Sequence, residues 1–165
     1  MSRVVLGLGT NIGDRMRNLQ FAVDSLHLVP KLQVLAVSEV YETVPVGFAE
    51  QPDFLNAAVL LETDLSPKTV LGLCLGIEAA AGRKRTVKDG PRVRDMEVLL
   101  YENVKSDSFE LTLPHPAMLE RAFVLVPLAD LFPQGRALGV NFGAVLRDMD
   151  KSGVRQTDYK LNTEA

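Results

Sequence analysis

The chain has 165 residues, of which 47% are hydrophobic and 24% charged, a composition typical of one folded domain spanning 1–165 rather than of a disordered chain. Its net charge of −3 argues against nucleic-acid binding by the surface as a whole. No apolar run reaches the roughly 20 residues of a membrane-spanning helix and no export signal is recognisable, so we expect a cytoplasmic protein that binds no membrane.

The first part of the chain predicts a strand, a helix and a second strand. The apolar run 4–8 indicates a strand, and β-branched and aromatic residues indicate another over 34–43. Between them Asp14 is placed to cap a helix. The buried face of that helix shows as apolar residues at helical spacing: Leu19, Ala22, Val23 and Leu26. Two prolines and a glycine predict a loop over 44–53.

A second unit of strand, helix and strand follows. Residues 54–63 predict a third strand, and Ser66 before Pro67 predicts the start of a helix that ends at Gly82. We expect this helix to bury Val70, Leu73, Cys74 and Ile77, with Cys74 as an inert apolar residue. Residues 94–101 predict a fourth strand, in which two sets of side chains alternate: Asp95, Glu97 and Leu99 against Met96, Val98 and Leu100.

Shorter elements complete the expected fold. Residues 111–113 predict a short strand beside the fourth one, 123–131 a helix interrupted at Pro127, and 142–149 a short helix. From residue 151 the polar composition predicts a loose tail, 151–165. The order of the units is that of an α+β, ferredoxin-like split βαβ fold, a mostly antiparallel sheet with its helices packed on one side.

Glycines at positions 7, 9 and 13 lie where a strand gives way to a helix. Their spacing is one residue longer than the dinucleotide-binding fingerprint, and no acidic residue closes a second strand about 20 positions later. No Lys-Ser or Lys-Thr pair follows, as a P-loop would require. The pattern therefore favours a tight turn over an oxidoreductase site.

A basic stretch precedes two carboxylates on one strand face. The stretch contains Arg83, Lys84, Arg85, Lys88, Arg92 and Arg94. Asp95 and Glu97 repel one another unless a cation lies between them, and Mg²⁺ accepts one or two carboxylates together with phosphate oxygens. Arginines suit the phosphates, and His115, held between two prolines, is placed to donate a hydrogen bond to one. The alternative is a solvated loop with ordinary salt bridges.

Five motifs occur in the order found in 6-hydroxymethyl-7,8-dihydropterin pyrophosphokinases, and the chain resembles that family from its first strand to about Leu131. The motifs are Gly9-Thr10-Asn11-Ile12-Gly13-Asp14, Tyr41-Glu42-Thr43-Val44-Pro45-Val46-Gly47, Gln51-Pro52-Asp53-Phe54-Leu55-Asn56-Ala57-Ala58, Gly90-Pro91-Arg92-Val93-Arg94-Asp95-Met96-Glu97 and Pro114-His115-Pro116. The resemblance implies a monomeric ATP-dependent pyrophosphokinase of folate biosynthesis. In this reaction the pterin hydroxymethyl oxygen attacks the β-phosphorus of ATP, and AMP leaves.

The resemblance also implies roles for individual residues. Asp95 and Glu97 would hold two Mg²⁺ ions and, with Arg83 and Arg92, act in catalysis. ATP would be bound by Arg83, Arg85, Arg92, Leu111, Thr112, His115 and Arg121, with residues 83–90 as a lid. The pterin slot would consist of Thr43, Val46, Phe54, Asn56 and Phe123.

Several residues depart from the pattern of the family. Glu97 stands where a second aspartate is usual, Arg94 where an apolar residue is usual, and Val44 where a second proline is usual. Asp89 replaces a lid tryptophan, and Leu75 replaces a glutamine expected near the nucleoside. A weakly active or non-catalytic relative that binds pterin or nucleotide is therefore the alternative to an active enzyme.

Overall fold

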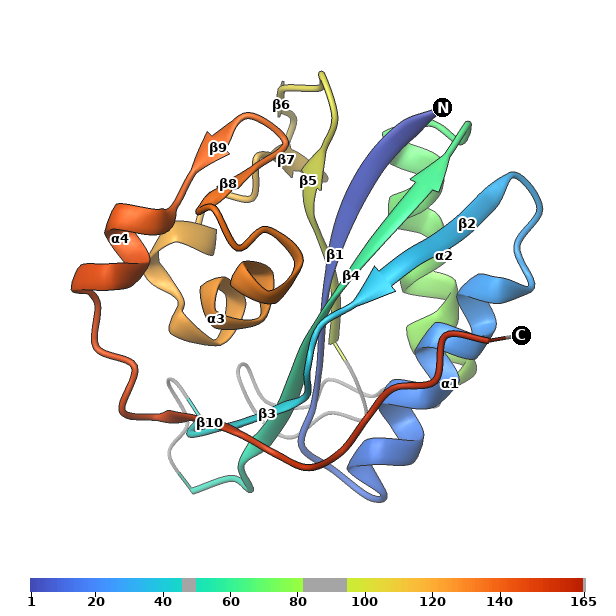
Figure 1. Cartoon of the computed structure of the whole chain (residues 1–165). Coiled ribbons are helices and arrows are strands. Elements are labelled where there is room, and N and C mark those ends of the chain that lie inside the picture. Colours follow the sequence, from blue (N-terminus) through green and yellow to red (C-terminus); the bar gives the residue numbers. More distant parts are fainter. Residues whose placement is uncertain (46–49, 82–94, 165) are drawn as a thin grey trace.

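The computed structural model describes residues 1–45, 50–81 and 95–164 (Figure 1). In chain order the elements are β1 (Ser2–Thr10), α1 (Arg15–His27), β2 (Leu32–Val37), β3 (Tyr41–Thr43), β4 (Phe54–Thr63), α2 (Pro67–Ala80), β5 (Asp95–Tyr101), β6 (Ser106–Asp107), β7 (Thr112–Leu113), a 3₁₀ turn (Met118–Glu120), α3 (Ala122–Leu131), β8 (Arg136–Ala137), β9 (Val140–Asn141), α4 (Gly143–Asp148) and β10 (Val154–Gln156). None of the helices in these ranges is long and apolar enough to cross a bilayer.

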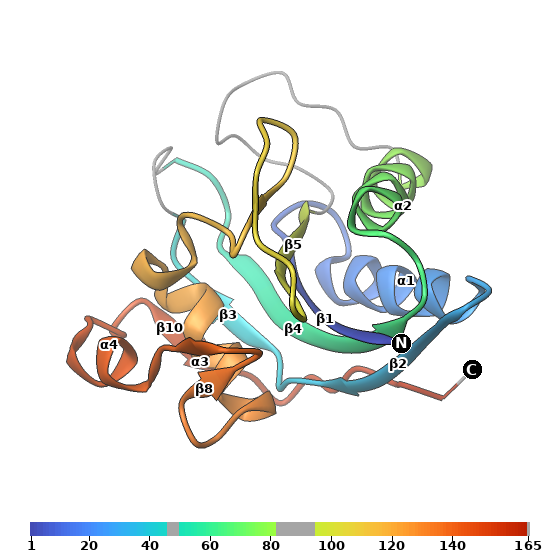
Figure 2. The ribbon, with the colours of Figure 1, turned by 90° about the horizontal axis from the view of Figure 1, so that it is seen from above.

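The centre of the molecule is an antiparallel sheet in the order β10-β3-β4-β1-β5, with β2 also paired to β4. The predicted antiparallel sheet with packed helices is confirmed. The prediction that helices cover one side is wrong, because α1 and α2 pack on one face and α3 on the other (Figures 1 and 2). The reason lies in β4, whose apolar residues point to both faces, so that each face needs a cover.

Helix α1 begins and packs as its sequence predicts. The carboxylate of Asp14 accepts a hydrogen bond from the Arg17 amide at 3.1 Å, which satisfies one of the unpaired donors of the first turn. Its four predicted apolar residues are all buried against the sheet. The helical spacing of the apolar residues therefore predicted both the presence of this helix and the face that it turns towards the sheet.

Helix α2 begins as predicted at Ser66, whose hydroxyl accepts from the Thr69 amide at 3.2 Å. It ends at Ala80, and Gly82 lies outside the described residues. Leu73 was expected in the buried stripe but is only half-buried, and Glu78 is buried instead. Glu78 accepts a hydrogen bond from the Met96 amide at 2.7 Å, which explains how a carboxylate is tolerated there.

Cys74 is fully buried in α2, and burial raises the pKa of its thiol to about 12. A thiol that stays protonated at neutral pH is a poor nucleophile. The expectation of an inert apolar residue agrees with this environment.

Two irregularities in the strands were not predicted. The expected strand 34–43 is divided into β2 and β3, because 38–40 lie opposite only two residues of β4. In β5 a bulge at Leu99 shifts the pairing with β1 by one residue, so Leu100 turns to the α3 side and packs with Leu99. The predicted grouping of Leu100 with Met96 and Val98 is therefore wrong.

Two details beyond β5 also differ from expectation. The short strand near residue 112 forms as β7, but it pairs with β6 through Leu113 and Ser106 rather than with β5. Helix α3 runs through Pro127 without interruption. Pro127 is buried, as are Val124, Leu125 and Leu128 of the same helix, and the burial of this apolar face offsets the missing backbone hydrogen bond. The predicted short helix after Phe142 is confirmed as α4.

The predicted loose tail is instead packed against the sheet. Its strand β10 pairs with β3, whose outer edge would otherwise expose unpaired backbone groups. Further along, Leu161 is 9% exposed and belongs to the hydrophobic core on the α1 and α2 side of the sheet. The Asn162 amide donates to Gln20 at 2.8 Å. Polar composition alone did not reveal this pairing, because backbone hydrogen bonds do not depend on side-chain hydropathy.

Candidate active site

A cleft of about 920 Å³ opens on the α3 face of the sheet. Its floor is formed by β1, β4 and β5, and its walls by β3, the beginning of α3 and the residues that lead into β10. Several chemically distinct side chains reach it from these elements, among them Asn56, Glu97 and Arg121. The cleft therefore joins parts of the chain that lie far apart in sequence.

Glycines in β1 make the floor of this cleft. Gly7 pairs with Glu97 on β5, and Gly9 lies between Asp95 on β5 and Asn56 on β4. A Cβ atom at Gly9 would meet Asn56 Nδ2 at 2.7 Å, so a side chain there would displace the amide. The turn interpretation applies to Gly13, whose φ is 67°, whereas Gly7 and Gly9 are strand residues that leave space for the cleft.

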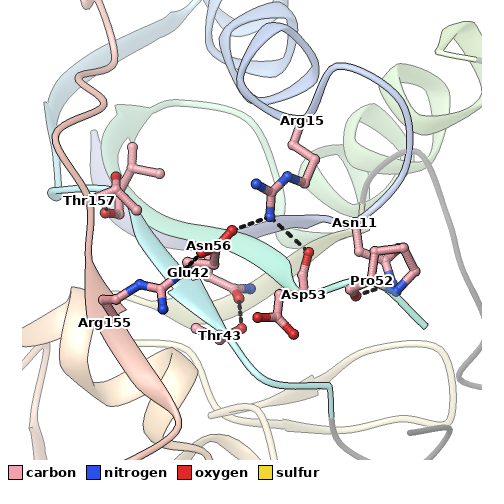
Figure 3. A network of polar contacts seen from close by, with 10 residues as sticks. Asn11, Arg15, Glu42, Thr43, Pro52, Asp53, Asn56, Arg155 and Thr157 are labelled. Carbon is pink, nitrogen blue, oxygen red and sulfur yellow. Dashed lines mark hydrogen bonds and ion pairs between the residues drawn. The ribbon is translucent and has the colours of Figure 1, made fainter. Parts of the chain in front are cut away.

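At one end of the floor, Asn56 and Thr43 form a buried polar pair. The Thr43 hydroxyl donates to Asn56 Oδ1 at 2.5 Å (Figure 3). Asn56 Nδ2 donates to the Leu8 carbonyl at 3.4 Å. The amide carries two N–H groups, so the second is available to a ligand. Phe54 and Phe123 line the same cleft. Four of the five predicted pterin residues are thus brought together, and Val46 lies outside the described residues.

At the other end, Asp95 and Glu97 share the cleft face of β5, as the strand alternation predicts. Glu97 lies beside two groups expected to bind phosphate. Its carboxylate accepts from Arg121 Nη1 at 3.1 and 3.3 Å, and His115 Nε2 lies 3.7 Å from Glu97 Oε1. Arg121 also lies over Phe123, with Cζ 5.5 Å from the ring centroid. The charged end and the aromatic wall of the cleft therefore meet at Arg121.

The surroundings of His115 favour a neutral ring. Burial lowers its pKa below the usual value, and Arg121 lowers it further, although Glu97 and Asp95 act in the opposite direction. Nδ1 accepts a hydrogen bond from the Ala117 amide at 3.2 Å. In a neutral ring the proton then belongs on Nε2, which is the nitrogen that faces Glu97. His115 can thus donate a hydrogen bond at the charged end of the cleft.

Of the remaining predicted site residues, only Leu111 and Thr112 lie in the part of the chain that the structure describes. Arg83, Arg85, Arg92 and the lid 83–90 lie outside the described residues, as do Arg94 and Asp89. Leu111 and Thr112 are described but do not line the cleft. The Leu111 carbonyl accepts from Ser106 and Ser108 hydroxyls at 2.6 and 2.9 Å, and the Thr112 hydroxyl donates to the Ser108 carbonyl at 3.1 Å.

Sequence reasoning missed a polar contact that holds the loop before β4. Asn11 Nδ2 donates to Gln51 Oε1 at 2.7 Å and to the Pro52 carbonyl at 3.2 Å, and both side chains are buried. Gln51 lines the cleft. Both residues belong to the quoted motifs, so the signal was present, but only the fold shows that the two motifs touch.

The family model described as 7,8-dihydro-6-hydroxymethylpterin-pyrophosphokinase (HPPK) matches residues 5–133. The chain belongs to this family. The resemblance inferred from the motifs is thereby confirmed. The match includes every strand of the cleft floor and the beginning of α3.

Relatives of this HPPK-family chain are similar over almost all of its length. A protein of Methylorubrum extorquens is 45% identical over 158 residues, covering 96% of this chain and 100% of its own. A protein of Bacillus subtilis is 43% identical, covering 96% and 92%. Both are named 2-amino-4-hydroxy-6-hydroxymethyldihydropteridine pyrophosphokinase.

Solved structures share the fold of this HPPK-family chain. The Plasmodium falciparum HPPK-DHPS A437G structure with SDX-DHP has a TM-score of 0.65 at 15% identity. The match covers 88% of this chain and 45% of that chain, so this chain spans less than half of the larger protein. At this identity the likeness concerns the fold alone.

Proposed function

We propose that this chain transfers pyrophosphate from ATP to the hydroxymethyl group of 6-hydroxymethyl-7,8-dihydropterin, giving AMP and the pterin diphosphate in folate biosynthesis. One observation carries the proposal. Asn56, which Thr43 on the wall holds in place, lies on the same cleft floor as the carboxylates of Asp95 and Glu97, with the glycines of β1 between them. A flat heterocycle and a polyphosphate can therefore bind side by side on the same surface.

The uncharged end of the cleft suits a pterin ring. Asn56 offers an N–H donor, and its Oδ1 is already fixed by Thr43, so the amide is held in one orientation. Phe54 and Phe123 supply aromatic surface for the faces of the ring. We assign Val46 to the same slot on the family resemblance. These residues bind and orient the pterin so that its hydroxymethyl group points towards β5.

The charged end suits a metal-bound triphosphate. Among the described residues no cluster of three or more metal-ligating side chains is present. Two carboxylates are nonetheless sufficient for Mg²⁺, which takes its other ligands from phosphate and water. Asp95 and Glu97 therefore fit the ions, of which we propose two. When bound, Mg²⁺ would neutralise the charge that develops on the triphosphate.

Arg121 and His115 are the proposed phosphate contacts among the described residues. Both now face Glu97, at 3.1 Å and 3.7 Å, so the same donors are aimed at the place where phosphate oxygens would enter. Arg83, Arg85 and Arg92 are proposed as further ATP contacts, with 83–90 as the lid, and Leu111 and Thr112 as nucleoside contacts. Their roles rest on the family resemblance.

The proposal also covers the fold type, the oligomeric state and the cellular location of the protein. The strand order β5-β1-β4, with β2 and β3 both paired to the other edge of β4, supports a ferredoxin-like split βαβ core. We further propose a single-domain monomer that acts in the cytoplasm. Size-exclusion chromatography with light scattering would test the monomer, and fractionation of the source cells would test the location.

The decisive experiment is an incubation with ATP, MgCl₂ and 6-hydroxymethyl-7,8-dihydropterin, followed by measurement of AMP and pterin diphosphate. We expect both products in equal amounts, and neither when the pterin is omitted or when Asp95 is changed to Asn. Pterin binding without AMP release would instead support a non-catalytic binding relative.

A further inference from the structure

The C-terminal segment, residues 150–162, follows the sheet from the α3 face to α1, where Asn162 contacts Gln20 (Figure 1). Asp150, Ser152, Gly153 and Val154 contribute to the wall of the cleft. Its far end is fixed by the burial of Leu161 in the core and by the hydrogen bond from the Asn162 amide to Gln20 on α1. The segment lies wholly beyond residues 5–133, the part of the chain that matches the family, so that match assigns it no role.

Strand β3 depends on this segment for its position. It has only three residues, which allow few hydrogen bonds with β4. On its other side Thr43 pairs with Val154, and the Val44 amide donates to the Gly153 carbonyl at 3.0 Å. The strand that carries the Thr43 hydroxyl is therefore held between β4 and the C-terminal segment.

Glu42 anchors the same strand from the opposite face. Because neighbouring strand residues point to opposite sides, Glu42 points away from the cleft that Thr43 lines. Glu42 Oε2 accepts from Arg15 Nη1 at 2.6 Å, and Oε1 pairs with Arg155 (Figure 3). Arg15 also donates to the Asp53 carbonyl at 3.0 Å, just before β4 begins. The Glu42 side chain is only 17% exposed, so its two cations are not easily replaced by water.

We propose that the C-terminal segment is a positioning element of the pterin end of the cleft. Through Glu42, Arg155 ties β3 to β10, while Arg15 ties the same carboxylate to the residue before β4. Together these contacts fix the Thr43–Asn56 pair in its ligand-binding geometry. This inference rests on the proposed function, since it concerns the same site. Arg155 is a positioning residue, because it acts through Glu42 and does not itself line the cleft.

The test compares Arg155→Glu with Lys160→Glu. Both residues belong to the C-terminal segment and both are mostly exposed. Arg155 pairs with Glu42 in β3, and Lys160 pairs with Glu39 just before β3. The two variants change the net charge equally, so long-range effects on nucleotide binding are matched. Only Arg155→Glu places a second carboxylate beside Glu42, the residue that holds β3.

Calorimetry with 6-hydroxymethyl-7,8-dihydropterin and, separately, with magnesium and ATP gives the main result. We expect Arg155→Glu to raise the pterin dissociation constant at least about fivefold, the effect of one close like-charge contact in a partly exposed site. Nucleotide affinity should change less than about twofold, within the range of surface substitutions. Arg155→Lys should restore most of the pterin affinity, and Lys160→Glu should bind like the unchanged protein.

Amide hydrogen exchange of β3 supplies a readout that needs no ligand. It should be faster in Arg155→Glu than in Lys160→Glu. Equal pterin affinity in the two variants, or a parallel loss of pterin and nucleotide binding in Arg155→Glu, would overturn the proposal. If the unchanged protein forms no AMP and binds no pterin, the proposed function fails and the binding part of this inference fails with it. The exchange rates would then still decide whether Arg155 holds β3.

Discussion

Substitution of Gly9 by alanine tests the geometry of the cleft floor directly. The added Cβ would lie 2.7 Å from Asn56 Nδ2, about 0.7 Å closer than the 3.4 Å at which ordinary contact begins. The amide is the end of a side chain and can move, so the sheet should survive. Its movement breaks the 2.5 Å hydrogen bond from Thr43 and leaves buried polar atoms unpaired.

A buried polar group left unpaired costs about 1–3 kcal/mol, which corresponds to roughly 5- to 150-fold in a dissociation constant. We therefore expect pterin binding, measured by calorimetry, to weaken by this factor while the affinity for magnesium and ATP stays nearly constant. Gly7→Ala should have a smaller effect, because its Cβ would meet the flexible Leu99 side chain at 3.2 Å.

The matched control is Gly72→Ala on α2, where an added Cβ meets nothing within 4 Å. In a helix this change should raise the free energy of unfolding by about 0.5–1 kcal/mol and leave pterin binding unchanged. Unaltered pterin affinity in Gly9→Ala would refute the reasoning, since the amide would then be displaced without consequence.

Four further predictions concern the two ends of the cleft and the core. Asn56→Ala should weaken pterin binding by about 1–3 kcal/mol with nucleotide affinity unchanged in calorimetry; loss of ATP binding alone would mean that the two ends are assigned the wrong way round. EDTA should abolish ATP binding, and equal affinity with and without it would contradict the assignment of Asp95 and Glu97. The Glu97 side chain contacts Arg121, and Glu97→Asp shortens this side chain by about 1.5 Å. We expect the rate of AMP release to fall by about tenfold or more. An unchanged rate would exclude Glu97 as a metal ligand. Cys74 should react with a thiol reagent only after unfolding, and rapid reaction of the native protein at neutral pH would contradict its burial. Because burial raises the thiol pKa from 9.0 to about 12, the buried thiol contributes its full share of the free energy of unfolding below pH 9.0. This contribution should decline as the pH rises towards about 12.

Glu97 illustrates how far one substitution can be judged from the fold. The family resemblance gives this position to an aspartate, and the longer side chain raised the alternative of a weakly active relative. In the structure the carboxylate lies between Arg121 and His115, which are the groups expected to meet the phosphates. The longer Glu97 side chain therefore still lies within the charged end of the cleft. For this reason we expect an aspartate at this position to give a lower rate of AMP release in this chain.

The sequence by itself determined those features that depend on neighbouring residues. Helical and strand periods located α1, α2, β4 and β5, and the capping residues Asp14 and Ser66 marked where the helices begin. Alternation along β5 placed Asp95 and Glu97 on one face, and the motifs indicated Thr43 and Asn56. These inferences succeed because backbone geometry repeats every two or 3.6 residues, whatever the rest of the chain does.

Only the tertiary structure decided the features that depend on pairing between distant segments. The bulge at Leu99 arises from the register between β5 and β1. The role of Gly9 appears only once Asn56 is seen 2.7 Å from the place its side chain would occupy. Residues 151–164 are polar and have no strong period, yet Val154–Gln156 among them pair with β3 because that edge offers unpaired backbone groups. No local sequence pattern predicts this strand pairing. Backbone donors and acceptors are the same for almost every residue, and they are paired only when two strands come together in the fold.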